Sequence, residues 1–175
     1  MEYSFNNSTL EFPRLTKTQT LVFKYSCQKA ISQGHAILTI GDIWEKIQDI
    51  GISDADIFSS MEILRQRNYI YTHCAVFDRN EVLYLFSISH AGLGVYLSKT
   101  FRSIGSIFNR LYILLEDVFS YPDNTVRITS DEIASYLNVP KLIVNHLLEE
   151  FETERKIGLD KNQVLGNWEV LSFYD

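Results

Sequence analysis

Two kinds of hydrophobic spacing alternate along the first hundred residues and mark the predicted elements. Apolar side chains that recur every three or four residues share one face of a helix, whereas a short continuous apolar run is typical of a strand. Helical spacing predicts helices over residues 16–34, 39–51, 53–68 and 90–99. Residues 35–38 predict a short strand, and the two runs 69–77 and 82–88, rich in Tyr, Ile and Val, predict a β-hairpin.

The second part of the chain repeats this order of elements. A wide apolar stripe predicts a long helix over residues 101–119, which ends before Tyr121-Pro122-Asp123-Asn124. The elements predicted after it are a short strand over 126–128, helices over 129–137 and 140–151, and a hairpin from the runs 157–159 and 167–173. The series of long helix, short strand, helix, turn, helix and hairpin therefore occurs twice.

Helix-capping signals stand at equivalent places in the two halves. Thr129 and Glu132 form a capping box, in which each side chain can bond the backbone N–H of the other residue. Thr39 and Asp42 form the same pattern with a shorter acid, 90 positions earlier. A solenoid needs at least three repeats, so this sequence indicates two similar modules side by side.

The chain of 175 residues accordingly divides into three predicted parts: a polar extended arm over residues 1–15, a first module over 16–100 and a second module over 101–175. A module of roughly 80 residues buries a core only marginally on its own, so we expect the long helix over 101–119 to pack between the two. Hydrophobic residues make up 46% of the chain, with 11 Phe and 10 Tyr, which excludes a disordered chain. The predicted fold class is α+β, mostly helical.

The segment after the first hairpin carries the most particular motif. Ser89, Gly92 and Tyr96 look like the leucine-threonine-x-x-glycine-x-x-x-tyrosine segment that follows the wing in many bacterial winged-helix regulators, with Ser89 in place of threonine. With its order of elements, clearest over residues 128–173 and weaker over 38–99, the chain resembles two tandem modules of the winged helix-turn-helix superfamily. The resemblance implies a fold that transcription regulators often use, and that also serves protein interaction and dimerisation.

In a helix-turn-helix, the second helix enters the major groove of DNA and its outward side chains contact the bases. In the first module the expected DNA-binding residues are Ser59, Ser60, Ile63, Gln66 and Arg67 on this helix, and Arg79 at the hairpin tip. Asp54 and Asp56 stand at the helix start, where phosphate would bind, and stabilisation of the helix dipole is their simpler role.

The equivalent helix of the second module has Lys141, Asn145 and His146 as its expected outward residues. Asn can bind adenine and Lys can bind guanine in the major groove. Glutamates follow at positions 149, 150, 152 and 154 and would repel phosphate, so we favour a solvated helix face here. The first module is therefore the predicted DNA reader, with Lys141 and Asn145 as secondary candidates.

The net negative charge of the chain argues against binding of nucleic acid. The chain has a formal charge of -6; residues 1–100 hold 9 basic and 10 acidic residues, and residues 101–175 hold 7 and 12. Because nucleic-acid binders present a basic patch, any such patch on this chain must be local.

Enzyme sites are not indicated. His73 and Cys74 are adjacent in a predicted strand and so point to opposite faces, which prevents them from sharing one metal ion. Gly92-x-Gly94 lacks the third glycine of a dinucleotide site, and Cys27 is 47 positions from Cys74, which suits reduced thiols. We expect no catalytic residues, no cofactor and no metal. Without a spanning segment or a signal peptide, the expected location is the cytoplasm, with no membrane contact.

The main functional hypothesis is a dimeric, non-catalytic DNA-binding transcription regulator. The alternative is a winged-helix protein–protein interaction module that binds a basic protein or another copy of itself and does not bind DNA, as the acidic second module suggests. A sensor that holds an effector between the modules is a third possibility. The DNA sequence, the partner and the oligomeric state stay open.

Overall fold

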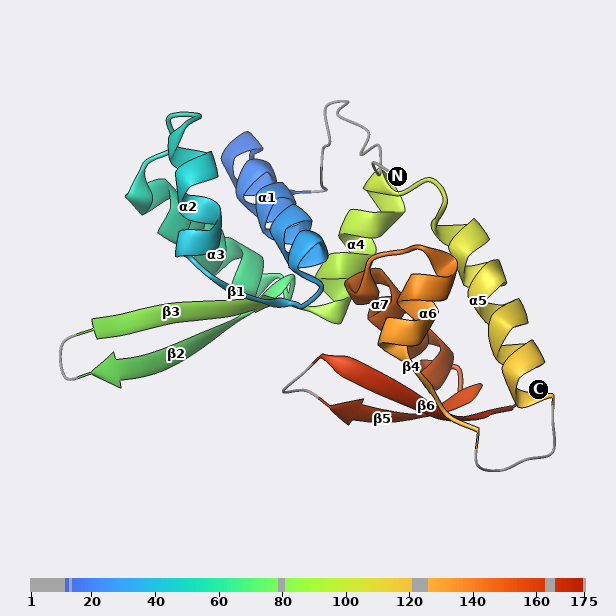
Figure 1. Ribbon diagram of the computed structural model, residues 1–175. Coiled ribbons are helices and arrows are strands. Elements are labelled where there is room, and N and C mark those ends of the chain that lie inside the picture. Colours follow the sequence, from blue (N-terminus) through green and yellow to red (C-terminus); the bar gives the residue numbers. More distant parts are fainter. Residues whose placement is uncertain (1–11, 13, 79–80, 121–125, 163–165, 175) are drawn as a thin grey trace. The chain divides into compact units, whose positions relative to one another are not determined.

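The computed structural model describes residue 12 and residues 14–78, 81–120, 126–162 and 166–174. In this part of the chain it contains seven helices and two three-stranded antiparallel sheets, an α+β fold that is mostly helical (Figure 1). The contacts divide the chain into two compact units, Met1–Arg102 and Ser103–Asp175. Within the described ranges, no helix combines the length and the apolar composition needed to cross a membrane.

The first unit contains four helices and one sheet. Its elements in chain order are α1 (Lys17–Gln33), β1 (Ile37–Thr39), α2 (Gly41–Gln48), α3 (Asp54–Gln66), β2 (Ile70–Asp78), β3 (Glu81–Ile88) and α4 (His90–Thr100). The sheet order is β1-β3-β2, so the short strand pairs with the second strand of the hairpin. Leu38 lies opposite Phe86 in this pairing, and both side chains are buried.

The second unit repeats the same connection with one helix fewer. Its elements are α5 (Ile104–Phe119), β4 (Ile128–Thr129), α6 (Ser130–Leu137), α7 (Lys141–Thr153), β5 (Ile157–Asn162) and β6 (Asn167–Phe173). The sheet order is β4-β6-β5, which again places the short strand beside the second strand of the hairpin. The predicted order of elements is therefore present in both units.

The predicted Thr–acid bonds form in both units, and in the second unit they make a complete capping box at the start of α6. In the second unit Thr129 Oγ1 accepts a bond of 3.3 Å from Glu132 N, while Glu132 Oε2 accepts one of 2.8 Å from Thr129 N. The bonds that the Thr129 N–H and hydroxyl donate to the Glu132 carboxylate lower the pKa of Glu132. In the first unit Asp42 Oδ2 accepts from Thr39 N at 2.7 Å in the same arrangement.

Several predicted boundaries differ from the structure by one to three residues, and two differences have a clear physical reason. The long helix begins at Ile104 instead of Phe101, because Phe101 is buried and donates its N–H to Leu97 O at the end of α4. The predicted extended arm reaches the core at its end, since Phe12 is buried and its ring packs on Phe23 with a centroid distance of 5.2 Å. The rest of the arm, apart from residues 14 and 15, lies outside the described residues.

The motif after the first hairpin has a steric explanation. Ser89 Oγ accepts a bond from Gly92 N at 2.8 Å and donates to Asn68 O, so it caps α4 and ties this helix to the end of α3. A Cβ atom on Gly92 would lie 2.2 Å from the carbonyl oxygen of Tyr69, a distance that no side chain tolerates. Tyr96 is fully buried against Phe12 and Phe23. The motif therefore holds α4 on the body of the first unit.

The core of the second unit is built on stacked aromatic rings. Phe151 of α7 is fully buried, and its ring stacks on Phe108 of α5 with a centroid distance of 4.5 Å. Tyr112 extends the stack by contacting Phe151 and, edge to face, Phe173 of β6. Such ring pairs add about 0.5–1.5 kcal/mol beyond the area they bury, so this stack joins α5, α7 and β6 into one body.

Candidate binding surfaces

Helix α3 presents only part of the predicted DNA-binding set to solvent. Ser59 and Gln66 are exposed, and Ile63 and Arg67 are half-buried. Ser60 is 3% exposed, which corrects the prediction that it points outward. The physical reason is helical spacing: Ser60 lies three residues after Ile57 and four before Leu64, both fully buried, and so shares their face. Arg79, the sixth predicted residue of this module, lies outside the described residues.

Three of the exposed side chains of α3 are paired with one another. Arg65 donates two hydrogen bonds to the Glu62 carboxylate, at 2.9 and 2.7 Å, and Gln66 Nε2 donates a third at 2.9 Å. These bonds, the one from Arg65 first, lower the pKa of Glu62 to about 2. A DNA base would have to compete with the Glu62 carboxylate for the side chain of Gln66. The same carboxylate neutralises the charge of Arg65.

Helix α7 is enclosed around its middle, which corrects the prediction for two of its residues. Asn145 is 5% exposed and His146 is 8% exposed, whereas both were expected to point outward. The seven consecutive residues 142–148 are all buried, and seven residues cover the full circumference of a helix almost twice. This stretch therefore has no solvent-facing side that could enter a groove of DNA.

Asn145 has an internal partner in place of a base. Its Nδ2 donates to the carbonyl oxygen of Gly166 at 2.9 Å, and Gly166 is the residue just before β6. Lys141, which is half-buried, pairs with Asp131 of α6 at 3.1 Å. Both predicted DNA contacts of the second module are therefore used within the unit.

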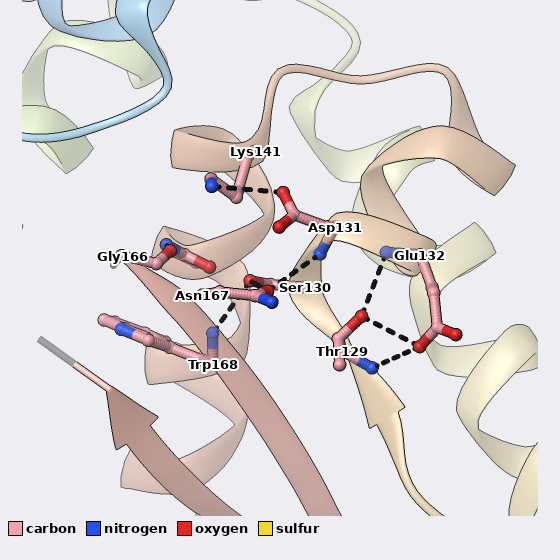
Figure 2. Close-up of polar contacts among 9 residues, drawn as sticks. Thr129, Ser130, Asp131, Glu132, Lys141, Gly166, Asn167 and Trp168 are labelled. Carbon is pink, nitrogen blue, oxygen red and sulfur yellow. Dashed lines mark hydrogen bonds and ion pairs between the residues drawn. The ribbon is translucent and has the colours of Figure 1, made fainter. Parts of the chain in front are cut away.

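A further polar network fixes the start of α6 against the start of β6, as Figure 2 shows. Asn167 Oδ1 accepts from Ser130 Oγ at 3.1 Å and from Asp131 N at 3.3 Å. Ser130 Oγ, fully buried, accepts in turn from Trp168 N at 3.0 Å. With the Asn145 bond, these contacts bind α6, α7 and the β5–β6 hairpin into one rigid frame.

We expect Asn145→Ala to destabilise the second unit, because the part-buried carbonyl of Gly166 then loses its donor. The net loss of one such hydrogen bond costs about 1 kcal/mol. The measurement is urea unfolding of proteins that also carry Trp44→Phe, followed by the fluorescence of Trp168, which lies two residues after Gly166. Ser135→Ala, at an exposed position of α6, is the matched control and should leave the midpoint unchanged. An unchanged midpoint for Asn145→Ala as well would contradict the anchoring role.

The two helix pairs share an acidic character. Together α2 and α3 carry five carboxylates and two cations, and α6 and α7 carry five carboxylates and one cation. The carboxylates are Asp42, Glu45, Asp54, Asp56 and Glu62 in the first pair, and Asp131, Glu132, Glu149, Glu150 and Glu152 in the second. Lys161 of β5 pairs with Glu149 at 3.4 Å and Glu152 at 2.6 Å. The helices that would face DNA are thus net negative in both units.

Aromatic side chains stand among the acids of the first pair. The rings of Trp44 on α2 and Phe58 on α3 meet edge to face, with a centroid distance of 6.4 Å. Phe58 is exposed and Trp44 is half-buried, and Ile50, in the turn between the two helices, is exposed as well. The neighbouring positions Glu45 and Asp49 are exposed carboxylates, and we call the part of α2 and α3 that carries Trp44, Phe58, Glu45 and Asp49 the acidic-aromatic surface. It combines an apolar anchor point with negative charge.

The second unit contains a groove between α5 and α6. Its volume is about 440 Å³, and its lining residues are Arg110, Ile113, Leu114, Asp117, Tyr136 and Leu137. Ile113 is 62% exposed and Tyr136 is 71% exposed, the two most exposed large apolar side chains of the described chain. Arg110 Nη2 donates to Leu137 O at 3.2 Å and so joins the two helices at one end.

Sequence reasoning missed this groove, although one signal was present. Ile113 lies outside the apolar stripe of the long helix, so an isoleucine there is expected to face solvent. Tyr136 gave no comparable signal, because its exposure depends on how α6 packs on α5.

No protein-family model matches the chain, and no curated protein matches it either.

Proposed function

We propose that the chain consists of two winged-helix modules that act as a non-catalytic protein-interaction module. Three features support the winged-helix arrangement: the shared order of elements, the equivalent sheet orders β1-β3-β2 and β4-β6-β5, and the Ser89–Gly92–Tyr96 motif after the first hairpin. In this fold α3 and α7 take the place of the helix that reads DNA.

The observation that carries the proposal is the negative charge of the two helix pairs and the internal bonding of their candidate DNA contacts. Their pairs carry five carboxylates each against two cations or one, and Gln66, Lys141 and Asn145 are bonded within their own units. Double-stranded DNA carries about one negative charge per 1.7 Å of its axis, so a net negative helix pair repels it. A positively charged protein segment is attracted by the same surface.

The acidic-aromatic surface indicates the chemistry of the partner. Trp44 and Phe58 can pack against an apolar side chain, and aromatic residues are enriched at the centres of protein interfaces. Glu45 and Asp49 are exposed and can pair with Lys or Arg. The matching partner is an amphipathic basic segment with an apolar anchor, which binds as a helix on a groove or face.

The first experiment compares two labelled probes by fluorescence polarisation with the purified full chain. One probe is an amphipathic peptide of Lys and Leu, about 18 residues or five helical turns long. The other is a mixture of genomic DNA fragments. At about 50 mM salt we expect the peptide to bind, with an affinity that falls as salt is added, and the DNA not to bind.

Charge reversal locates the binding surface. Glu45→Lys should weaken peptide binding about fivefold, the effect of losing and reversing an exposed ion pair worth about 1 kcal/mol. Asp160→Lys makes the same change at an exposed position of β5 and should leave the affinity unchanged. Equal effects of the two variants would show that net charge alone attracts the peptide.

Binding of DNA is the outcome that replaces this proposal by the competing one, a winged-helix transcription regulator. That function requires an affinity that falls steeply with salt and that is lost on Arg67→Glu, the basic residue predicted to contact DNA at the end of α3. Absence of peptide binding to the folded chain would overturn the basic-partner assignment.

A further inference from the structure

The exposed face of α5 has a charge pattern that is complementary to itself. Arg110 lies on this face toward the start of the helix, and Glu116 and Asp117 lie on it toward the end. Ile113 stands between them, three residues after Arg110 and three before Glu116. Residues three, four and seven positions apart share one side of a helix, so these four side chains form one stripe.

The direction of the charges selects one way of pairing two copies of this helix. In a parallel pair, Arg110 would meet Arg110 and the carboxylates would meet one another, which is unfavourable. In an antiparallel pair centred on Ile113, Arg110 of each copy lies opposite Glu116 and Asp117 of the other. A twofold axis produces this arrangement, because each contact then occurs twice with the roles of the copies exchanged.

The groove supplies the apolar part of the same contact. Ile113 and Tyr136 are exposed on either side of it, and Leu114 and Leu137 form its base. An isoleucine that approaches from a second α5 can enter this groove and cover both exposed side chains. The remaining exposed residues of the face are small or polar, namely Gly105, Ser106, Asn109 and Ser120. A Cβ on Gly105 would meet no heavy atom within 4 Å, so a second helix can approach closely.

We propose that the α5–α6 groove is the interface of a homodimer, in which α5 pairs antiparallel with α5 of a second copy about a twofold axis at Ile113. With 16 residues, α5 is about 24 Å long, enough for four turns of contact. The dimer does not depend on the proposed function, because the same interface serves a module that binds protein and one that binds DNA. The groove is lined by none of the acidic residues named above on α2, α3, α6 and α7.

The test is the mass of the full chain in solution by light scattering after size-exclusion chromatography. The chain has a mass of 20.3 kDa, and at about 50 μM we expect twice this value, with return to the monomer on dilution. A mass of 20.3 kDa at all concentrations up to about 500 μM, where even a weak dimer forms, overturns the proposal.

Two charge variants identify the interface. Arg110→Glu places three carboxylates in each half of the dimer, and the double variant Glu116→Arg with Asp117→Arg places three guanidinium groups there. Each variant alone should dimerise about tenfold or more weakly, the effect of about 1.4 kcal/mol of like-charge repulsion. In an equimolar mixture every pair is again of opposite charge, so the mass should double on mixing.

The mixture separates loss of pairing from loss of folding. A variant that has unfolded does not recover a partner, whereas a folded variant with reversed charge does. Trp168 fluorescence and circular dichroism of each variant check the fold before mixing. Dimers that persist in both single variants, or a mixture that stays monomeric while both variants are folded, would place the contact elsewhere and reject the pairing of α5.

Discussion

Replacing Gly92 by alanine is expected to unfold the first unit. The added methyl group would lie 2.2 Å from the carbonyl oxygen of Tyr69 and 2.9 Å from its carbonyl carbon and Cα, all of them backbone atoms that cannot rotate away. The Tyr69 carbonyl also accepts a bond of 3.0 Å from Ser89 N, so a shift of α4 breaks this bond. Overpacking usually costs about 1–3 kcal/mol, and a clash with fixed backbone exceeds that range.

The two tryptophans allow each unit to be followed separately. Trp44 lies in the first unit and Trp168 in the second, and they are the only tryptophans of the chain. In a Trp168→Phe background, the fluorescence of Trp44 should report unfolding of Gly92→Ala at a urea concentration far below that of the parent. We expect the free energy of unfolding of the first unit to fall by more than about 3 kcal/mol, which is a large part of the stability of a small domain.

Gly41→Ala is the matched control in the same unit. Its added Cβ would meet Thr39 Oγ1 at 3.5 Å, an ordinary contact, and Gly41 lies at the start of α2. Its midpoint should stay at or slightly above the parent value, because alanine lowers the entropy of the unfolded chain. A Gly92→Ala protein with the parent midpoint would mean that α4 is not held against Tyr69 as described.

Replacing Phe151 by alanine is expected to destabilise the second unit by about 3–5 kcal/mol, the usual cost of removing a buried phenylalanine side chain. Phe151 is fully buried and stacks on Phe108 and Tyr112. Its removal opens a cavity where α5 and α7 meet, and so takes support from the helix that forms one wall of the groove. The loss therefore includes both the transfer of the ring to water and the dispersion contacts of its neighbours.

Trp168 fluorescence in a Trp44→Phe background measures this effect. Phe151→Leu should recover part of the loss, because leucine fills part of the cavity. Tyr174→Ala, which removes another aromatic ring from the same unit at a position that is 57% exposed, should change the midpoint little. If Phe151→Ala were no less stable than Tyr174→Ala, the stack would not be the centre of this core.

Local signals in the sequence predicted the elements because their partners are close in the chain. Thr129 and Glu132 are three residues apart, and Gly34 takes the left-handed conformation that ends α1, with φ of 76°. Strand β6 occupies the predicted range 167–173, since its composition and its flanking turn are local properties. The start of α5 was misassigned because Phe101 donates a backbone bond to Leu97 at the end of α4, which hydrophobic spacing does not reveal.

The binding surfaces depend on contacts between distant residues, so the sequence did not predict them. Asn145 was expected to face outward, and its partner Gly166 is 21 residues away. The groove forms from Ile113 and Tyr136, on two helices whose packing decides what stays exposed.

The sequence by itself therefore determined the order of helices and strands, their caps, the internal repeat and the acidic charge. These follow from hydrophobic spacing and from bonds between residues three or four positions apart. Only the tertiary structure decided that Ser60 and Asn145 are buried, and that Gln66, Lys141 and Asn145 are bonded internally. It also decided that Ile113 and Tyr136 stand beside a groove. The physical reason is that exposure is set by whichever element packs on a face, and that element comes from far along the chain.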